Sequence, residues 1–513
     1  MVLPLHDRIM PRTGVRRDAG VDIMPDIDLN RDSEYAHYLW HLHDAGVITL
    51  ELADGGDLPR YEVSGSVWDD LYDDAVDPSL VAMIDNGCSS QHPYLPPAGD
   101  AGGMVEGIDF ATHDFGAIIR PLGAAENPQD CTTDREGRRN HFDAANTADP
   151  QFWQRINDFD QATDIPGVSD IIDALEISAG VVRSVTTYAD DLPTHGTLLA
   201  GVVGGRAPAV MPEECAEAIA YFGADPRCRL LPLNTSFRPE FIGLIHALLY
   251  AVGMGADVIC IPRAIYMPTA KGNKVDPHRP KDKRASRIDT DPVLKQQAAI
   301  FEALLLEIAA RVPVIVAAGN NGFKSETVYP ASLAGPDNAL ISVGAINGKR
   351  KFSSYTNTRN VTVYAPSDDA PVWTRRELRL DPKGRTMHDH EVTQAESEPE
   401  EAGDYSTWGV LSTDVPGAFG AEDGGVSTIE ETGYDSLIMQ RSQFASFGGT
   451  SAASGIVAGV VSLLQAKRRK EGQAPMTGTE MKLHLQTNCP DLAIGLDGAT
   501  VKRIDADSCL QAI

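Results

Sequence analysis

From residue 79 onward, short apolar runs rich in valine, isoleucine and leucine alternate with stretches of helical periodicity. The apolar runs are SLVAMID ending at Asp85, CRLLPLN ending at Asn234, ADVICIP ending at Pro262, VPVIVAAG ending at Gly319, ALISVGAI and NVTVYAP. Apolar side chains recur at helical spacing over residues 241–248, 301–308, 451–469 and 477–487. Because this alternation is typical of parallel sheets, it predicts an α/β fold in three layers, with a mostly parallel sheet flanked by helices on both faces.

Three long insertions interrupt the alternation. Residues 98–180 are rich in Gly, Pro, Asp and Asn, and we expect them to have little core of their own beyond a helix near IIDALEI. Residues 267–290 form a basic loop, and residues 367–405 are polar and increasingly acidic, which predicts a solvated or disordered segment. Residues 1–78 precede the first core strand and form an N-terminal extension, either a propeptide or an accessory segment. The main domain is expected to occupy residues 79–513.

The charge balance argues against several classes of partner. Lys and Arg number 44 against 73 Asp and Glu, which gives a formal net charge of -29 at pH 7. Such a chain repels nucleic acid backbones and anionic membranes, so neither is expected as a partner.

The cysteines and the N-terminus bear on location. The chain has 7 cysteines, an odd number, and none forms a CxxC pair suited to zinc or redox chemistry. The N-terminus lacks the apolar segment of a secretory signal, and no apolar run is long enough to span a bilayer. These features together predict a soluble protein in the reducing cytoplasm.

Polar residues follow the predicted strands, at the sheet edge where open parallel sheets place their functional groups. Asp85 ends VAMID, His195 opens a run of small residues in THGTLLAG, and Asn320 follows the strand in VIVAAGNNG. Ser451 lies in FGGTSAASGIVAG, which also has the pattern of a capped helix start. Taken singly, each residue has a plain structural reading as a turn former, a helix cap or a buried polar group.

Taken together, and in the chain order Asp, His, Asn, Ser, these residues resemble the subtilisin-like serine proteases, the subtilases. The resemblance extends over residues 79–465. The segments that carry it are VAMIDNG, THGTLLAG, VIVAAGNNG with VYPAS and ISVGAI, KFSSYTN with VTVYAP, and GGTSAASGIVAG.

The resemblance implies a serine endopeptidase with a polypeptide substrate. Ser451 would attack the scissile carbonyl, His195 would accept its proton, and Asp85 would orient the imidazole. Asn320 and the Ser451 backbone N–H would stabilise the oxyanion. No organic cofactor is expected. Calcium supports many subtilases structurally, but no acidic loop here matches a ligand pattern. The residues implied in substrate binding are Pro262, Arg263, Ala264, Ala318 and Gly319.

The sequence departs from the family pattern at two places. Gly455 stands where the family has a proline, which predicts a softer start of the last long helix. Pro262, Arg263 and Ala264 replace a Ser-Leu-Gly edge that pairs with the substrate backbone. One hypothesis is that Arg263 and the basic loop favour acidic groups of the substrate or one acidic partner. The other is that the loop is solvated and Arg263 points outward.

Other functions were weighed against this interpretation. A noncatalytic subtilase-fold module that binds a peptide would explain the altered edge and Gly455. A nucleotide-binding enzyme based on GVVGG or GMGA lacks the strand-to-helix glycine fingerprint.

A metal cluster could be formed by His37, His41 and His43 with Asp44. An amphipathic helix that packs Leu39 and Leu42 explains the same spacing.

Overall fold

The computed structural model describes a little over half of the chain. The described residues are 39–52, 61–72, 76–89, 92–96, 103–105, 107–111, 117–118, 149–177, 194–206, 221–235, 239–265, 291–322, 327–348, 350–353, 355–368, 410–415, 444–494 and 499–513. The basic loop at 267–290, His37, and the acidic segment beyond Asp368 lie outside them.

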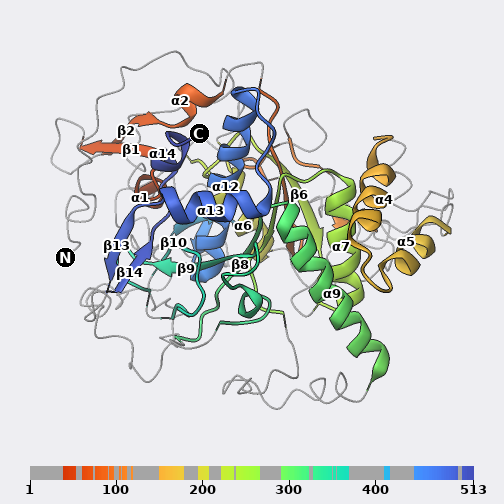
Figure 1. The fold of residues 1–513 in the computed structure, drawn as a ribbon. Helices are drawn as coiled ribbons and strands as arrows, with labels where there is room; N and C mark the ends of the chain where they lie inside the picture. The colour runs from red at the N-terminus through yellow and green to blue at the C-terminus, as the bar shows by residue number, and fades with distance from the viewer. Residues whose placement is uncertain are drawn as a thin grey trace.

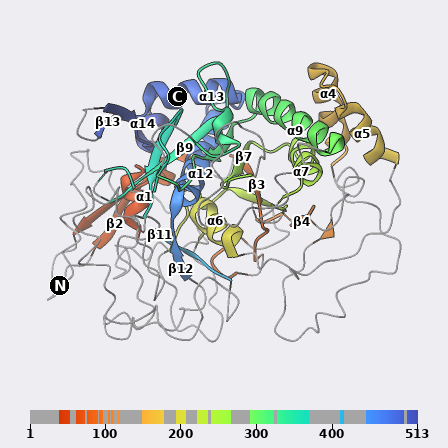
Figure 2. The same ribbon diagram turned by 90° about the horizontal axis from the view of Figure 1, so that it is seen from below.

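The centre of the molecule is an 8-stranded sheet with the strand order β10-β9-β8-β7-β3-β6-β4-β5 (Figures 1 and 2). Neighbouring strands are parallel except for the β4–β5 pair. In sheet order the strands are β10 Val363–Pro366, β9 Ile341–Ile346, β8 Val314–Ala317, β7 Val258–Ile261, β3 Leu80–Asp85, β6 Arg229–Asn234, β4 Ile108–Asp109 and β5 Ala117–Ile118. The predicted mostly parallel sheet is confirmed.

Both faces of the sheet are covered, and successive strand residues pack on opposite sides. Val81 and Met83 of β3 join one hydrophobic cluster, and Ala82 and Ile84 join the other. The first cluster also contains side chains of α6 (Thr194–Gly204) and α12 (Gly449–Lys470). The second contains side chains of α7 (Phe241–Gly253) and α9 (Pro292–Arg311). The helices therefore form the two outer layers that the sequence predicts.

Most of the remaining elements outside the insertion at 98–180 pack against the edge strand β10 or against the covering helices α6, α9 and α12. At the N-terminal side they are α1 Trp40–Asp44, β1 Ile48–Leu52, β2 Tyr61–Ser66 and α2 Trp68–Leu71. Towards the C-terminus they are η3 Ala331–Leu333, β11 Val410–Thr413, β12 Phe444–Phe447, α13 Gly478–Asn488, β13 Asp491–Ile494, β14 Ala499–Lys502 and α14 Ala506–Leu510. In Figure 1 the N-terminal elements and α14 lie on the same side of the molecule as α12.

The described part of the N-terminal extension shares the hydrophobic core of the main domain. Trp68 is 1% exposed, and its indole N–H donates to the Ala224 carbonyl at 3.0 Å. The Tyr72 hydroxyl donates to Oδ1 of the buried Asp225 at 2.6 Å, while Ser462 of α12 donates to Oδ2 at 2.5 Å. Burial raises the pKa of Asp225 to about 6, although its hydrogen bonds offset part of that effect.

The insertion at 98–180 contains more core than its composition indicates. Helix α4 (Phe152–Thr163) was not predicted, and α5 (Val168–Ile177) includes the predicted IIDALEI. Phe152, Ile156 and Leu175 are buried in the cluster that covers α7 and α9. Strand β4 also lies inside this range. The expectation of little core was wrong, because polar residues between the widely spaced apolar positions of α4 hide its helical face.

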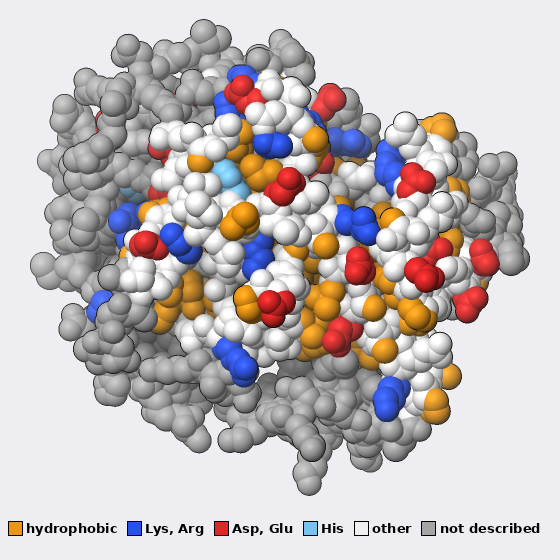
Figure 3. Space-filling model, viewed as in Figure 1, with side chains coloured by type: hydrophobic (Ala, Val, Ile, Leu, Met, Phe, Trp, Pro, Cys, Tyr) orange, Lys and Arg blue, Asp and Glu red, His pale blue; other side chains and the backbone are white. Residues whose placement is uncertain are grey.

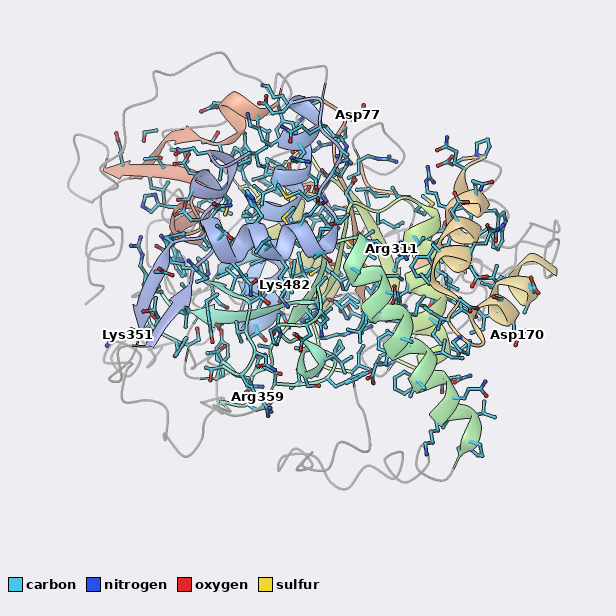
Figure 4. All side chains as sticks on the ribbon, in the orientation of Figure 1. Asp77, Asp170, Arg311, Lys351, Arg359 and Lys482 are labelled. Carbon is cyan, nitrogen blue, oxygen red and sulfur yellow. The ribbon has the colours of Figure 1, made fainter. Side chains whose placement is uncertain are left out.

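Helix α13 is fixed at its start and along its length. Thr477 and Glu480 form a capping box, in which each side chain accepts from the other residue's backbone N–H. Further along, Lys482 donates to the carbonyls of Gly335 at 2.7 Å and Asn338 at 2.8 Å, which ties the helix to the loop before β9 (Figure 4). Burial lowers the pKa of Lys482 to about 8. The predicted helix at 477–487 is confirmed.

Among the described helices, α12 alone is long and apolar enough to cross a membrane. Its apolar window is 100% buried inside the protein, and this packing accounts for its composition. On the face drawn in Figure 3, the described basic and acidic side chains are interspersed rather than gathered by sign.

We predict that the N-terminal extension contributes to the stability of the whole domain. Leu71 of α2 is 2% exposed, whereas Leu483 of α13 is 64% exposed. Leu71→Ala should lower the free energy of unfolding by about 2–5 kcal/mol, because it leaves a cavity in the shared core. The same substitution at Leu483 should change it by about 0.5 kcal/mol or less. Urea denaturation measures both, and equal effects would contradict a shared core.

Candidate functional site

The segments that carry Asp85 and His195 pack directly against each other. The Gly196 N–H in the first turn of α6 donates to the Asn86 side-chain oxygen at 2.8 Å. A Cβ atom on Gly196 would lie 1.7 Å from the Gly87 carbonyl oxygen, so only glycine fits there. This close contact between the segments DNG (85–87) and HG (195–196) brings the end of β3 against the start of α6 and explains the glycine after His195.

Asp85 and His195 form a direct hydrogen bond. Oδ2 of Asp85 lies 2.6 Å from Nδ1 of His195, with the Asp85 side chain 1% exposed and that of His195 20% exposed. Burial is the largest influence on this carboxyl group and by itself raises its pKa. The pKa of Asp85 is nevertheless below its usual value, because His195 and the Arg263 guanidinium both face the carboxylate.

His195 also contacts the segment that leads to Ser451. Its ring packs edge-on against Phe447 of β12, with ring centroids 5.3 Å apart. Gly448 and Gly449 follow, and α12 begins at Gly449, so that Ser451 lies in its first turn. The imidazole therefore contacts both the Asp85 carboxylate and the strand that delivers the serine.

Ser451 is buried in this structure and its hydroxyl is engaged. The residue is 8% exposed, and Oγ donates a hydrogen bond to the Pro262 carbonyl at 2.6 Å. Pro262 follows directly after β7. Ser451 thus lies where the start of α12 meets the carboxyl end of β7, beside the positive end of the helix dipole.

Asn320 is held by Thr450, a residue that the sequence interpretation missed. The Thr450 N–H and hydroxyl both donate to Asn320 Oδ1, at 2.8 and 2.9 Å. The Gly319 N–H in turn donates to the Thr450 hydroxyl at 3.0 Å. Because Oδ1 accepts these bonds, the Asn320 amide nitrogen is the group left to act as a donor. A Cβ on Gly449 would lie 2.6 Å from that nitrogen, which explains the second glycine of FGGTS.

A buried pair, Tyr355 and Asp368, fixes the start of α12 and was also missed. The Tyr355 hydroxyl donates to Asp368 Oδ1 at 2.5 Å, and the Gly449 N–H donates to the same oxygen at 3.0 Å. Burial, and then the Asp368 charge, raise the pKa of Tyr355 well above its usual value. Tyr355 lies in the quoted segment KFSSYTN, but nothing in the letters assigns it a partner.

The structure describes all five predicted substrate-binding positions and corrects the expected orientation of one of them. Ala264 is exposed, whereas Ala318 and Gly319 are buried and their backbone groups bond within the protein. Arg263 was expected either to face the rim of the cleft or to point into solvent. It is instead 6% exposed, with Nη1 4.0 Å from Asp85 Oδ1 and Nη2 bonded to the Thr235 hydroxyl. A substrate-contact role for these residues stays a prediction.

Gly455 has a packing role that the family comparison did not indicate. It is the seventh residue of α12 rather than part of its first turn, so the preorganisation argument for proline does not apply. A Cβ there would lie 2.5 Å from Val202 Cγ2 and 2.9 Å from Leu199 Cδ1. Both neighbours belong to α6, so the missing side chain lets the helices of His195 and Ser451 approach closely.

The cysteines and histidines near these elements are packing residues. Cys88 and Cys260 are buried, and burial raises the pKa of both thiols. His41 and His43 lie buried in α1, and the Leu50 N–H donates to His43 Nδ1 at 3.1 Å. No group of three His, Cys, Asp or Glu able to hold a metal occurs in the described part of the chain.

The fold and this arrangement define a subtilisin-like α/β protein with a candidate serine site. The structure brings Asp85, His195, Asn320 and Ser451 to one edge of the sheet, at the ends of β3 and β8 and the starts of α6 and α12. A model of the subtilase family matches residues 78–503. The chain belongs to the subtilase family.

Solved structures similar to this chain share little sequence with it. The nisin leader peptidase of Lactococcus lactis is 13% identical, with a TM-score of 0.48 and coverage of 93% of this chain and 95% of that one. The epidermin leader peptide processing serine protease of Staphylococcus aureus is 15% identical, with a TM-score of 0.49 and coverage of 94% and 83%. A cold-adapted subtilisin-like serine proteinase is 14% identical, with a TM-score of 0.42 and coverage of 91% and 97%. No curated protein matched the chain.

We predict that Gly455→Ala destabilises the protein, although alanine in a helix interior normally adds about 1 kcal/mol of stability. The added methyl would overlap Val202 and Leu199, and overpacking costs about 1–3 kcal/mol. Gly335→Ala is the matched control, since the nearest atom to its Cβ is 3.9 Å away. Thermal denaturation compares the two, and a higher melting temperature for Gly455→Ala would contradict close packing of α6 and α12.

Proposed function

We propose that the protein is a serine endopeptidase that hydrolyses peptide bonds through an acyl-enzyme on Ser451. The observation that carries the proposal is the 2.6 Å bond between buried Asp85 and His195, next to the segment that presents Ser451. With Nδ1–H donating to the carboxylate, Nε2 of a neutral imidazole is left as a proton acceptor. A polypeptide is the proposed substrate.

The proposed reaction begins with a change at the serine. Its hydroxyl must leave the Pro262 carbonyl and turn towards His195, which takes the proton as Oγ attacks the scissile carbonyl. The resulting oxyanion would be stabilised by the Asn320 amide nitrogen and the Ser451 backbone N–H. His195 then protonates the leaving amine. Water then attacks the acyl-enzyme while His195 accepts its proton. Return of that proton to Oγ releases the acid and restores the Ser451 hydroxyl.

One observation is compatible with a second function, a noncatalytic module that binds peptides. In this structure the Ser451 hydroxyl is bound to Pro262 and the residue is only 8% exposed. A resting enzyme and a binding module would both show this bond, so reactivity has to separate them.

The N-terminal extension bears on the mature form. We propose that residues 39–72 stay with the enzyme as an accessory segment. Their removal would expose the pocket of Trp68 and leave the buried Asp225 without the Tyr72 hydroxyl. A propeptide that is cleaved away would be expected to bind the surface of the finished domain and not its core.

A fluorophosphonate probe tests the proposed nucleophile. The full chain should be labelled on Ser451, and Ser451→Ala should abolish labelling, because only an activated serine attacks the probe. Ser454→Ala is the matched control, because its hydroxyl donates to the Thr450 carbonyl within α12 and should leave labelling intact. Mass spectrometry of the labelled protein should also find residues 39–72. Folded protein that takes no label would favour the binding module.

Asn320→Ala tests the oxyanion stabilisation. We expect kcat for a peptide substrate to fall by about 100- to 1000-fold with little change in KM, since the lost donor acts mainly in the transition state. Asn321→Ala, which removes the neighbouring amide, should change kcat far less. Steady-state kinetics measures both, and equal losses at the two positions would remove Asn320 from this role.

A further inference from the structure

Arg263 is a buried charge, and a buried guanidinium needs a partner to offset its desolvation. Its Nη1 lies 4.0 Å from Asp85 Oδ1, and its Nη2 bonds to the Thr235 hydroxyl. Residues 235 and 263 directly follow β6 and β7, the two strands that flank β3 in the sheet. The buried arginine therefore reaches from the carboxyl end of β7 to that of β6, past the carboxyl end of β3 that lies between them.

The two oxygens of the Asp85 carboxylate have different partners. Oδ2 faces His195 Nδ1 at 2.6 Å. Oδ1 accepts from the Asn86 N–H at 2.8 Å and faces Arg263 at 4.0 Å. This division fixes the rotation of the carboxylate and spreads its negative charge between two cations when the imidazole is protonated.

We propose that Arg263 is a positioning residue that reduces the electrostatic stabilisation of protonated His195 by Asp85. The site would then stay active at lower pH. The inference rests on the proposed function of the Asp85 and His195 pair. Arg263 acts through Asp85 and does not touch the reacting atoms.

The physical reason is the sign of the charges. A protonated His195 is stabilised by the Asp85 carboxylate and repelled by the guanidinium behind it. Within the described part of the chain, the other titratable groups that face Asp85 are Cys88 and Cys260, whose thiols stay neutral because burial raises the pKa of each. Arg263 is thus the charge that opposes Asp85 from the β7 side.

The experiment compares the pH profile of kcat/KM in the wild type, Arg263→Gln and Arg263→Lys. Arg263→Gln should move the midpoint of the acid limb up by about one pH unit, because the opposing charge is gone. Arg263→Lys should keep the midpoint near that of the wild type, because lysine retains the positive charge. A purely structural role of the guanidinium would not be rescued by lysine. An unmoved midpoint in active Arg263→Gln would overturn the inference.

A second measurement separates this inference from the proposed function. In the Ser451→Ala background, NMR can follow the titration of the His195 ring with and without Arg263→Gln. A midpoint that rises in Arg263→Gln supports the role of Arg263 even if the enzyme takes no probe. If Arg263→Gln does not fold, Thr235→Val loosens the guanidinium and should give a smaller rise. No movement in Thr235→Val would then overturn the inference.

Discussion

The candidate site depends on the contact between α6 and α12. One helix carries His195 and the other Ser451, and they meet where Gly455 leaves no side chain in the way of Val202 and Leu199. Because this contact lies within a close-packed core, the separation of the two helices cannot vary much. Asp85 and Asn320 lie at the carboxyl ends of strands, whereas the helices that carry His195 and Ser451 approach closely because Gly455 has no side chain.

The charges buried in this domain are managed in two different ways. Asp85 faces the imidazole of His195 and the guanidinium of Arg263, and the pKa of its carboxyl group is lowered. Asp225 has hydroxyl and backbone donors, and the pKa of its carboxyl group is raised to about 6. The first arrangement keeps a carboxylate charged beside an imidazole. The second joins the N-terminal extension to α12. Because the ordinary pKa of an aspartate is 3.8 and that of Asp225 is about 6, the folded state loses stability as the pH rises between these two values and Asp225 ionises.

Much of the fold was predictable from the sequence, because buried parallel strands are nearly continuous apolar runs and each ended close to its predicted residue. The pairing of Asp85 with His195 was implied by the resemblance to the subtilases. The inward orientation of Arg263 was not predictable, because a sequence pattern can place a residue at a strand end but does not determine the rotamer of its side chain. Thr450 and the Tyr355–Asp368 pair act through contacts between distant segments. Helix α4 was not predicted because its apolar face is narrow.

The two ends of the described chain meet, and this has a consequence for synthesis. The Ala506 N–H donates to the Ala45 carbonyl, and Arg503 donates to the carbonyl of Asp44. Helix α12 contacts both α2 and α14. During translation the segment at 44–45 is synthesised long before its partners at 503–506. The apolar face of that segment therefore stays without this cover until residues 503–506 have been synthesised, and the long separation in sequence makes the contact a slow, non-local step of folding.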